Sequence, residues 1–176
     1  MCVRPEDNVI VRAENTEDAE ERSAIHSINE AAFGCQDEAD LVDRLRTEGV
    51  VLVSLVAERQ GRIVGHILFS RMSIETTGGP VSAAALAPMA VLPEHQRRGI
   101  GGQLIRHGLN LLRGRGERIV IVVGHPDYYP RFGFSSEKAR SLESPFPGDA
   151  FMTMELSPGA LDGVRGRVSY PAVFGV

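Results

Sequence analysis

The stretch M-A-V-L-P-E-H-Q-R-R-G-I-G-G, residues 89–102, is the most informative part of the sequence for the fold. An apolar run ends at Pro93, and a turn with three glycines follows it. Apolar residues then recur every three or four positions, which is typical of a helix with one buried face. These apolar positions are Ile100, Leu104, Ile105, Leu109 and Leu112. The stretch therefore predicts a strand, a glycine-rich turn and the start of a helix.

The glycine-rich turn has the properties of an anion-binding site. Backbone N–H groups in the first turn of a helix have no partner within the helix, and they lie at the positive end of the helix dipole. Glycine lacks the Cβ that would keep an anion away from the backbone. Arg97 and Arg98 add positive charge that suits phosphate. The turn therefore predicts a phosphate site at the beginning of the helix.

The spacing of the glycines excludes two common phosphate-binding loops. A dinucleotide-binding fingerprint would place a third glycine at position 104, where Leu104 stands. The Gly-Lys-Ser/Thr of a Walker A loop is absent, and so are the catalytic sequences of protein kinases. On the glycines alone, a turn that binds no ligand stays open as an alternative.

Hydrophobic patterns along the chain predict a mixed α/β domain. Asn15 or Thr16 is expected to cap the first helix, with Ala19, Ile25, Ile28 and Ala32 on its apolar face. The expected order is strand Val9–Ala13, a helix to about Phe33, helix Asp37–Arg46, strands Val50–Glu58, Arg62–Ile74 and Val81–Leu92, a helix from Arg98 to near Arg115, strand Arg118–Val123, a short helix within Pro126–Arg131, and strand Phe151–Leu156. This order favours an α/β (α+β) fold with a partly antiparallel central sheet flanked by helices.

Composition is typical of a soluble globular protein. With 176 residues, 43% hydrophobic and 24% charged, the chain suits one domain, with a core over about residues 9–156 and a tail over 157–176. No apolar run approaches the roughly 18 residues of a membrane span, and residues 1–15 lack a signal-peptide pattern. A cytoplasmic location without membrane association is the expectation. Cys2 and Cys35 have neither metal-ligand nor disulfide spacing, so no metal is expected. The net charge of -4 argues against a nucleic-acid partner.

Two motifs in sequence order resemble those of a known family. Q-R-R-G-I-G, residues 96–101, resembles the Q/R-x-x-G-x-G/A motif of the GNAT superfamily of acetyl-CoA-dependent N-acetyltransferases. The preceding A-P-M-A-V-L-P-E-H, residues 87–95, resembles the splayed strand of that family, and Y-Y-P-R-F-G-F, residues 128–134, resembles its Y-x-x-x-G-F motif. The predicted element order is also similar over about residues 9–156. Within this superfamily, the chain resembles the bacterial branch of predicted N-acetyltransferases.

The resemblance implies a CoA cleft between a splayed pair of strands. It implies that backbone groups of the glycine-rich turn hold the pyrophosphate: Gln96, Arg97, Arg98, Gly99, Ile100, Gly101 and Gly102. Met89, Ala90 and Val91 would bind the pantetheine arm, and one of their N–H groups would polarise the thioester carbonyl.

The resemblance also implies a proton donor. Tyr129 matches the family tyrosine that protonates the leaving thiolate, and a phenol is protonated at pH 7. Tyr128 is off by one position, and a buried tyrosine without a catalytic role is the alternative for Tyr129. Many members carry an Asn and an Ala upstream on a longer helix, whereas Pro126 allows only a short helix here. The region beside the CoA sulfur is therefore expected to be built differently.

The reaction implied is direct attack of an unprotonated primary amine on the thioester, without a covalent enzyme intermediate. Glu38 is the favoured base because the loop after the first helix commonly lines the acceptor pocket in this family. The other candidate bases are His66, Glu75, His95 and His125. Cys35 has no paired base that would make it a nucleophile.

The acceptor is not identified by any motif. Asp37, Glu38 and Asp40 would suit a cationic acceptor such as a polyamine or an aminoglycoside. The resemblance also admits a homodimer and another acyl-CoA. Two other functions stay open. One is a CoA-binding regulatory module without turnover. The other is a nucleotide- or nucleic-acid-binding protein that uses a cluster of arginines, namely Arg97, Arg98, Arg106, Arg113, Arg115 and Arg118.

Overall fold

A computed structural model describes residues 8–146 and 148–176. Cys2 and the first residues of the segment considered for a signal peptide lie outside this part of the chain. The named elements are β1 (Val9–Ala13), α1 (Ala19–Phe33), α2 (Asp37–Thr47), β2 (Val51–Arg59), β3 (Arg62–Thr76), β4 (Gly79–Val91), α3 (Ile100–Gly114), β5 (Ile119–Val123), β6 (Leu142–Glu143), β7 (Phe151–Glu155) and β8 (Gly166–Ser169). Short 3-10 helices cover Pro93–His95, Tyr129–Phe132, Lys138–Ser141 and Ala172–Phe174.

The strands form one mixed sheet in the order β1-β2-β3-β4-β5-β7, and β8 joins it beside β3 and β6. Neighbouring strands in the main order are antiparallel except β4 and β5, which run parallel. Gln60 and Gly61 both have positive φ angles, of 53° and 73°, and make the predicted turn between β2 and β3. The predicted mixed, partly antiparallel sheet is confirmed.

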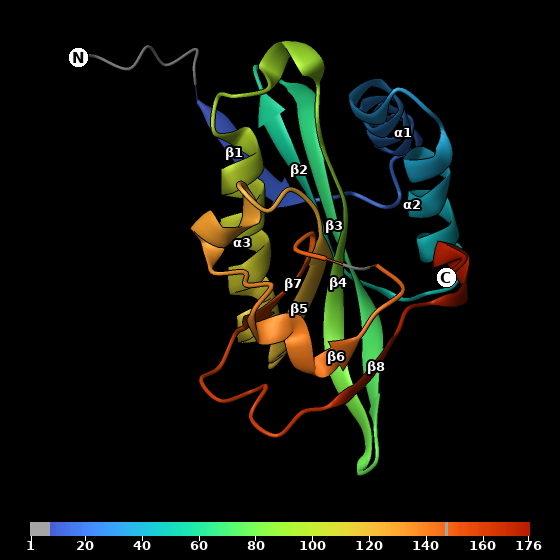
Figure 1. The fold of residues 1–176 in the computed structure, drawn as a ribbon. Helices are drawn as coiled ribbons and strands as arrows, with labels where there is room; N and C mark the ends of the chain where they lie inside the picture. Colours follow the sequence, from blue (N-terminus) through green and yellow to red (C-terminus); the bar gives the residue numbers. More distant parts are fainter. Residues whose placement is uncertain (1–7, 147) are drawn as a thin grey trace, which may run out of the picture.

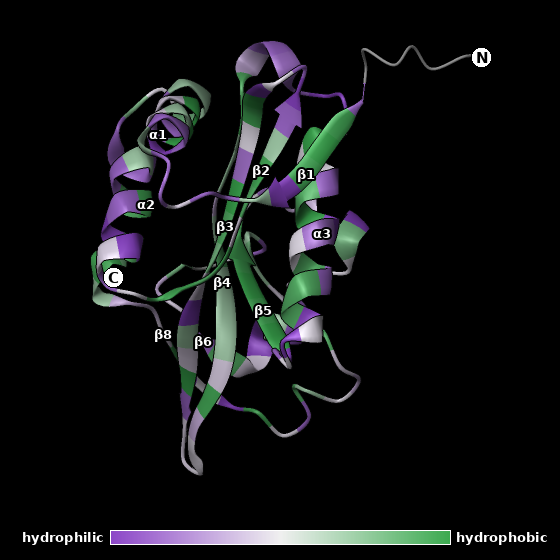
Figure 2. Cartoon of the chain, turned by 180° about the vertical axis from the view of Figure 1, so that it is seen from behind, coloured by the Kyte–Doolittle hydropathy of each residue, from purple (hydrophilic) through white to green (hydrophobic). Residues whose placement is uncertain are grey.

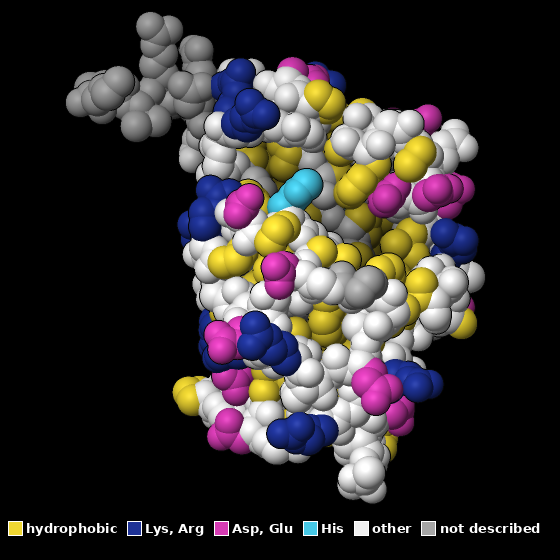
Figure 3. All heavy atoms as spheres, in the orientation of Figure 1, with side chains coloured by type: hydrophobic (Ala, Val, Ile, Leu, Met, Phe, Trp, Pro, Cys, Tyr) yellow, Lys and Arg dark blue, Asp and Glu magenta, His cyan; other side chains and the backbone are white. Residues whose placement is uncertain are grey.

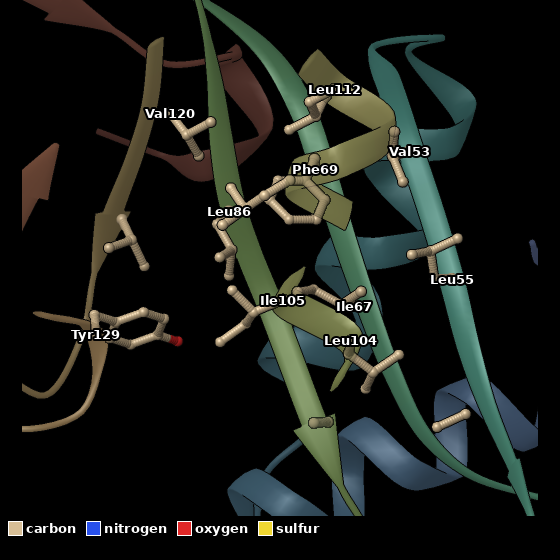
Figure 4. Close-up of a cluster of buried hydrophobic side chains, with 14 of the residues drawn as sticks. Val53, Leu55, Ile67, Phe69, Leu86, Leu104, Ile105, Leu112, Val120 and Tyr129 are labelled. Carbon is tan, nitrogen blue, oxygen red and sulfur yellow. The ribbon is translucent and has the colours of Figure 1, made fainter. Parts of the chain in front are cut away.

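Helices cover both faces of this sheet (Figure 1). Helix α3 packs on one face, whereas α1 and α2 lie together on the other, which the view from behind also shows (Figure 2). The five apolar residues predicted for the buried face of α3 are all buried. They pack with Phe69, Leu86 and Val120 of the sheet in the cluster drawn in Figure 4. Strand β5 is hydrophobic along its length (Figure 2), as a strand covered on both faces requires.

The start of α1 differs from the prediction. Asp18, not Asn15 or Thr16, is the N-cap, because its carboxylate accepts hydrogen bonds from the N–H groups of Glu20 and Glu21. The Asn15 side chain instead accepts from the N–H of Glu17 and closes a turn of its own. As a consequence, Ala19 is exposed, although it was expected on the apolar face.

Several element boundaries differ as well. Strands β3 and β4 extend as a hairpin to Thr76 and Gly79, beyond both predicted ends, because they stay paired down to the turn. The short helix expected within Pro126–Arg131 is a 3-10 helix at Tyr129–Phe132, which Gly133 ends with a φ of 103°. The segment expected only as a tail contributes β8, which pairs with β3 through residues 167–169.

Strands β4 and β5 pair over only three positions and then separate. Ala84, Ala85 and Leu86 pair with residues 120–122 of β5. Beyond Leu86, β4 stays with β3, and a bulge places Ala87 and Pro88 of β4 against the single residue Leu68 of β3. Proline has no N–H for a neighbouring strand. A gap therefore opens between β4 and β5 at the C-terminal end of each strand.

Candidate active site

A cavity of about 1090 Å³ lies at the gap between β4 and β5. Its lining comes from the turn and first residues of α3, from β4, from the loop after β5, from the end of α1 and start of α2, and from the C-terminal segment. Because α3 lies on one face of the sheet and α1 and α2 on the other, the cavity connects the two faces. Figure 3 shows the molecule hollowed beside α1 and α2, with hydrophobic side chains in the hollow.

The cavity begins at an uncapped helix N-terminus. Gly99, the residue before α3, has a φ of 82°, and no side chain caps the helix. The N–H of Gln103 donates to the carbonyl of Gly99 at 3.1 Å and makes the first helical bond. Within the described chain, no backbone partner accepts from the N–H groups of residues 100–102. These groups are available to an anion, as the sequence predicted.

The turn before α3 is tied to β4. Gln96 donates from its side-chain amide to the carbonyl of Val91 at 3.0 Å. Arg97 has a φ of 60°, which is uncommon for a residue with a Cβ and is found where the surrounding structure imposes it. Gln96 therefore fixes the turn with its side chain, while Arg97 lines the cavity.

Two aromatic side chains cover the glycines of the helix start. A Cβ on Gly101 would lie 2.8 Å from the Tyr128 hydroxyl, and one on Gly102 would lie 3.4 Å from the Phe132 ring. The guanidinium of Arg131 stacks over the Tyr128 ring at 4.5 Å from its centroid. Tyr128 thus lies beside the phosphate-binding turn, as a neighbour of Tyr129 with a separate place in the site.

The unpaired edge of β4 presents alternate backbone groups to the gap. The N–H of Leu92 donates to the carbonyl of Val64 at 2.9 Å across the β3–β4 pair. In an antiparallel pair the residues alternate between bonded and non-bonded positions. This alternation directs the backbone groups of Ala90 toward β3 and those of Met89 and Val91 toward the cavity. Met89 and Val91 therefore differ from Ala90, although the same role was predicted for all three from the sequence.

Tyr129 lines the cavity and is 8% exposed. Its ring packs edge-on against Tyr128 at 5.2 Å and Phe134 at 5.7 Å between centroids. Its hydroxyl points toward β4 (Figure 4). Burial, with a smaller contribution from Tyr128, raises the pKa of Tyr129 to about 12, so the phenol is protonated at neutral pH.

A glycine at the end of β5 makes room for that ring. A Cβ built on Gly124 would lie 2.2 Å from Cε2 of Tyr129. Gly124 was not identified from the sequence as a site residue, although it lies just upstream of Pro126. The available signal in the sequence was a glycine directly after a strand and five residues before the motif tyrosine. The close approach of the ring to this glycine depends on the tertiary structure, so the sequence did not reveal it.

The candidate bases separate into two groups. Glu38, His95 and His125 line the cavity, whereas His66 and Glu75 do not. Of the three acidic residues considered for a cationic acceptor, Glu38 is at the cavity, but Asp37 and Asp40 are exposed and do not line it. Only one of the three negative charges that were expected to bind a cationic acceptor therefore lies at the cavity.

Cys35 lies next to Glu38 and donates from its thiol to the Glu38 carboxylate at 3.2 Å. This hydrogen bond is the main reason that the pKa of the Cys35 thiol is raised. A raised pKa reduces the thiolate fraction, so the arrangement opposes a nucleophilic role for Cys35.

His66 belongs to a buried polar chain instead of the cavity. Its Nδ1 accepts from the Asn29 amide at 3.3 Å, and its Nε2 bonds with the hydroxyl of Ser54 at 2.9 Å. Ser54 in turn donates to Glu14, which is paired with Arg46. Burial, and secondarily the charge of Arg46, lowers the pKa of His66 to about 3. His66 is therefore neutral and structural.

Aromatic residues of the C-terminal part were not identified from the sequence as site residues. Phe146, Tyr170 and Phe174 line the cavity on the side of α1 and α2. No motif surrounds them, and only the return of the chain through β8 brings them to the cavity.

Two kinds of feature are absent from residues 8–146 and 148–176. In that part of the chain, no group of three or more His, Cys, Asp or Glu is placed to hold a metal ion. Nor does it contain a helix of the length and apolar character that a membrane crossing needs.

The splayed sheet, the uncapped helix and the buried tyrosine define the class as a GNAT acyltransferase, and the family comparison agrees. The model of the acetyltransferase (GNAT) domain matches residues 14–136. The chain belongs to this family, and the family predicted from the two motifs is confirmed.

Named relatives place the chain among bacterial N-acetyltransferases. The uncharacterized N-acetyltransferase YjhQ of Escherichia coli K12 is 40% identical over 135 residues, which cover 74% of this chain and 75% of YjhQ. The crystal structure of YhbS from Escherichia coli in complex with CoA has a TM-score of 0.89 and 30% identity, over 100% of this chain and 97% of that one. A GNAT acetyltransferase from Brucella melitensis in complex with acetyl-CoA has a TM-score of 0.78 and 36% identity, over 95% and 98% of the two chains.

Proposed function

We propose that this chain transfers the acetyl group of acetyl-CoA to a primary amine by direct attack. The observation that carries the proposal is the single cavity that connects the free N–H groups of α3, the Tyr129 hydroxyl and Glu38 through the gap between β4 and β5. The CoA and acetyl-CoA complexes of similar structures support the choice of acyl donor.

The donor end of the cavity suits CoA. The N–H groups of residues 100–102 and the side chain of Arg97 would hold the pyrophosphate at the start of α3. Arg98, also expected at this site, is exposed in the same turn. The backbone groups of Met89 and the N–H of Val91 would then pair with the amides of the pantetheine arm, as a strand added to β4 would, while the carbonyl of Val91 stays bonded to Gln96. This arrangement leads the thioester toward Tyr129.

The transfer needs three proton movements. A base takes one proton from the ammonium, and the free amine forms a C–N bond to the thioester carbon while the C–S bond breaks. One outward N–H of β4 stabilises the charge that develops on the carbonyl oxygen. Tyr129 gives its proton to the leaving thiolate, and its pKa of about 12 keeps that proton available. The nitrogen then loses its second proton, directly or through water, to the Tyr129 phenolate that remains after the thiolate is protonated.

We propose Glu38 as the base, directly or through a water molecule. It is the only carboxylate among the described residues that line the cavity, and it lies at the end away from the arginines of the phosphate site. His125, which also lines the cavity next to the tyrosine motif, is the second candidate. Glu38→Gln and His125→Gln distinguish them, since loss of the base should lower kcat/KM for the amine, whereas the other variant should keep it.

The first test measures binding of the donor. Thermal unfolding would be followed with acetyl-CoA and with ATP as a control. At about 100 times the dissociation constant, binding stabilises by roughly 2.7 kcal/mol, which raises the Tm of a domain of this size by about 5–10 °C. Arg97→Glu is expected to weaken acetyl-CoA binding about tenfold. Arg165→Glu, the same charge change at an exposed site outside the cavity, should leave it unchanged.

The second test separates an enzyme from a binding module. CoA release would be measured with a panel of amines for the parent and for Tyr129→Phe. The variant should lose most of kcat and keep the acetyl-CoA shift in Tm. A normal shift in the parent without turnover of any amine would favour a regulatory module, and no shift at millimolar acetyl-CoA would refute the proposal.

A further inference from the structure

We propose that the acceptor is a small primary amine carried on an aromatic body, and that the C-terminal segment supplies the pocket for that body. The inference rests on the proposed acetyl transfer and adds the chemical class of the acceptor. It comes from the residues at the end of the cavity opposite the phosphate site: Phe33, Leu41, Phe146, Tyr170 and Phe174.

The fold places these residues on the acceptor side of the sheet. Phe33 ends α1, and Leu41 belongs to α2, while Tyr170 follows β8 directly. Phe174, in the last 3-10 helix, packs against the cluster that α1 and α2 form with the sheet. Figure 1 shows this end of the chain beside α2 and away from α3. An amine that enters here meets the thioester from the face opposite to the CoA pyrophosphate.

The three rings of the C-terminal part form a connected wall. Phe146 meets Tyr170 edge-on with 5.8 Å between centroids, and Tyr170 meets Phe174 at 5.2 Å. Rings in these geometries leave edges and faces that a further ring can pack against. Tyr170 also borders a second cavity of about 440 Å³. The wall is therefore suited to an aromatic body.

The charges at this end favour a monoamine over a polyamine. Glu38 is the only acidic residue among those that line the cavity in the described chain, and Asp37 and Asp40 face solvent. One carboxylate pairs with one ammonium. A second ammonium of a polyamine would meet aromatic and aliphatic side chains there, at a cost in desolvation.

The size of the cavity favours a small acceptor. Its volume of about 1090 Å³ must hold the pantetheine arm, the acetyl group and the acceptor together. Cavities for single drug-sized ligands span about 300–1,000 Å³. The space that remains beyond the thioester suits a single ring with a short amino side chain.

The test compares three amines on the full chain: 2-phenylethylamine, spermidine and a short peptide with a free α-amine. CoA release gives kcat/KM for each. The expected result is a kcat/KM at least tenfold higher for 2-phenylethylamine than for either of the others. Equal or higher values for spermidine or for the peptide would overturn the inference.

Variants of the pocket give a second measurement. Phe33 is 44% exposed, so Phe33→Ala should fold, and it should raise KM for 2-phenylethylamine about fivefold without changing the acetyl-CoA shift in Tm. Leu111→Ala is the matched control, because Leu111 is 42% exposed on α3 and does not line the cavity. Equal KM values for these two variants would also overturn the inference.

Tyr170 separates the contribution of the ring from that of its hydroxyl. The hydroxyl is buried and has no hydrogen-bond partner among the described residues. Tyr170→Phe should keep KM within about twofold, whereas Tyr170→Ser should raise it at least fivefold. If spermidine or the peptide is acetylated and 2-phenylethylamine is not, the acceptor inference fails alone. If acetyl-CoA does not bind, or binds without turnover of any amine, the proposed function fails with it.

Discussion

Gly124→Ala tests whether the position of Tyr129 controls turnover. The new Cβ would lie 2.2 Å from the ring, and ordinary contact begins at 3.4 Å, so the ring must move by 3.4 − 2.2, about 1.2 Å. The φ angle of Gly124 is not in the left-handed region, so the backbone itself accepts alanine. Tyr129 is 8% exposed and held between Tyr128 and Phe134, which leaves little room for the shift.

Two effects of different size follow from the shift. Overpacking of a buried ring costs about 1–3 kcal/mol of folding free energy, and each kcal/mol lowers the Tm of a domain of this size by about 2–4 °C. A catalytic group displaced by about 1 Å loses about 100-fold in rate. Gly124→Ala should therefore lower kcat far more than its modest loss of stability would suggest.

The assay is CoA release with the best amine of the panel, at a temperature well below the Tm of the variant. Gly114→Ala is the matched control, because a Cβ there meets no atom within 4 Å and Gly114 lies in a helix that alanine favours. It should keep kcat and keep or raise Tm. A Gly124→Ala variant with parental kcat and a lowered Tm would refute the idea that the position of the Tyr129 ring controls turnover. An unchanged Tm would refute the predicted clash between the new Cβ and that ring.

Three further predictions concern stability. In Gly108→Ala the new Cβ would lie 2.2 Å from the fully buried ring of Phe69. Overpacking should therefore outweigh the helix preference for alanine and lower Tm, and a higher Tm in a melting curve would contradict this. His66 has a folded pKa of about 3 against an ordinary 6.5, so between these pH values it takes up a proton only on unfolding. The free energy of unfolding should therefore decrease by about 1.4 kcal/mol for each unit by which the pH is lowered. His66→Gln should remove that slope in urea titrations at pH 4–6, and an unchanged slope would count against it. Asp18→Ala should cost about 1 kcal/mol in urea unfolding, more than Asn15→Ala, and the reverse order would show that the cap is misassigned.

Local patterns predicted most of the regular structure. The apolar repeat of α3 and the continuous run of β5 identify elements that are covered by neighbours, and both lie within a few residues of the predicted bounds. The helix start was less predictable, because Asn15, Thr16 and Asp18 are all good caps and only the hydrogen bonds distinguish them. Capping depends on backbone angles that the sequence leaves open.

The glycine-rich turn that we propose as the phosphate site was predicted from the sequence alone. Its glycines, its arginines and the helix that follows them are consecutive residues, so their spacing along the chain fixes their arrangement in space. The two GNAT motifs likewise identified the family without the structure. In the structure these motifs meet at one cavity, as the contact between Tyr128 and Gly101 shows.

The acceptor end was decided by tertiary structure alone. Phe33 and Glu38 are far in the sequence from Phe146 and Tyr170, and the four share no motif. They meet only because β8 returns the chain to β3 and the last residues pack on α2. The same folding removes Asp37 and Asp40 from the cavity while keeping Glu38. Residues one or two positions apart at a helix start point in different directions, so charge counted along the sequence did not predict charge in the pocket.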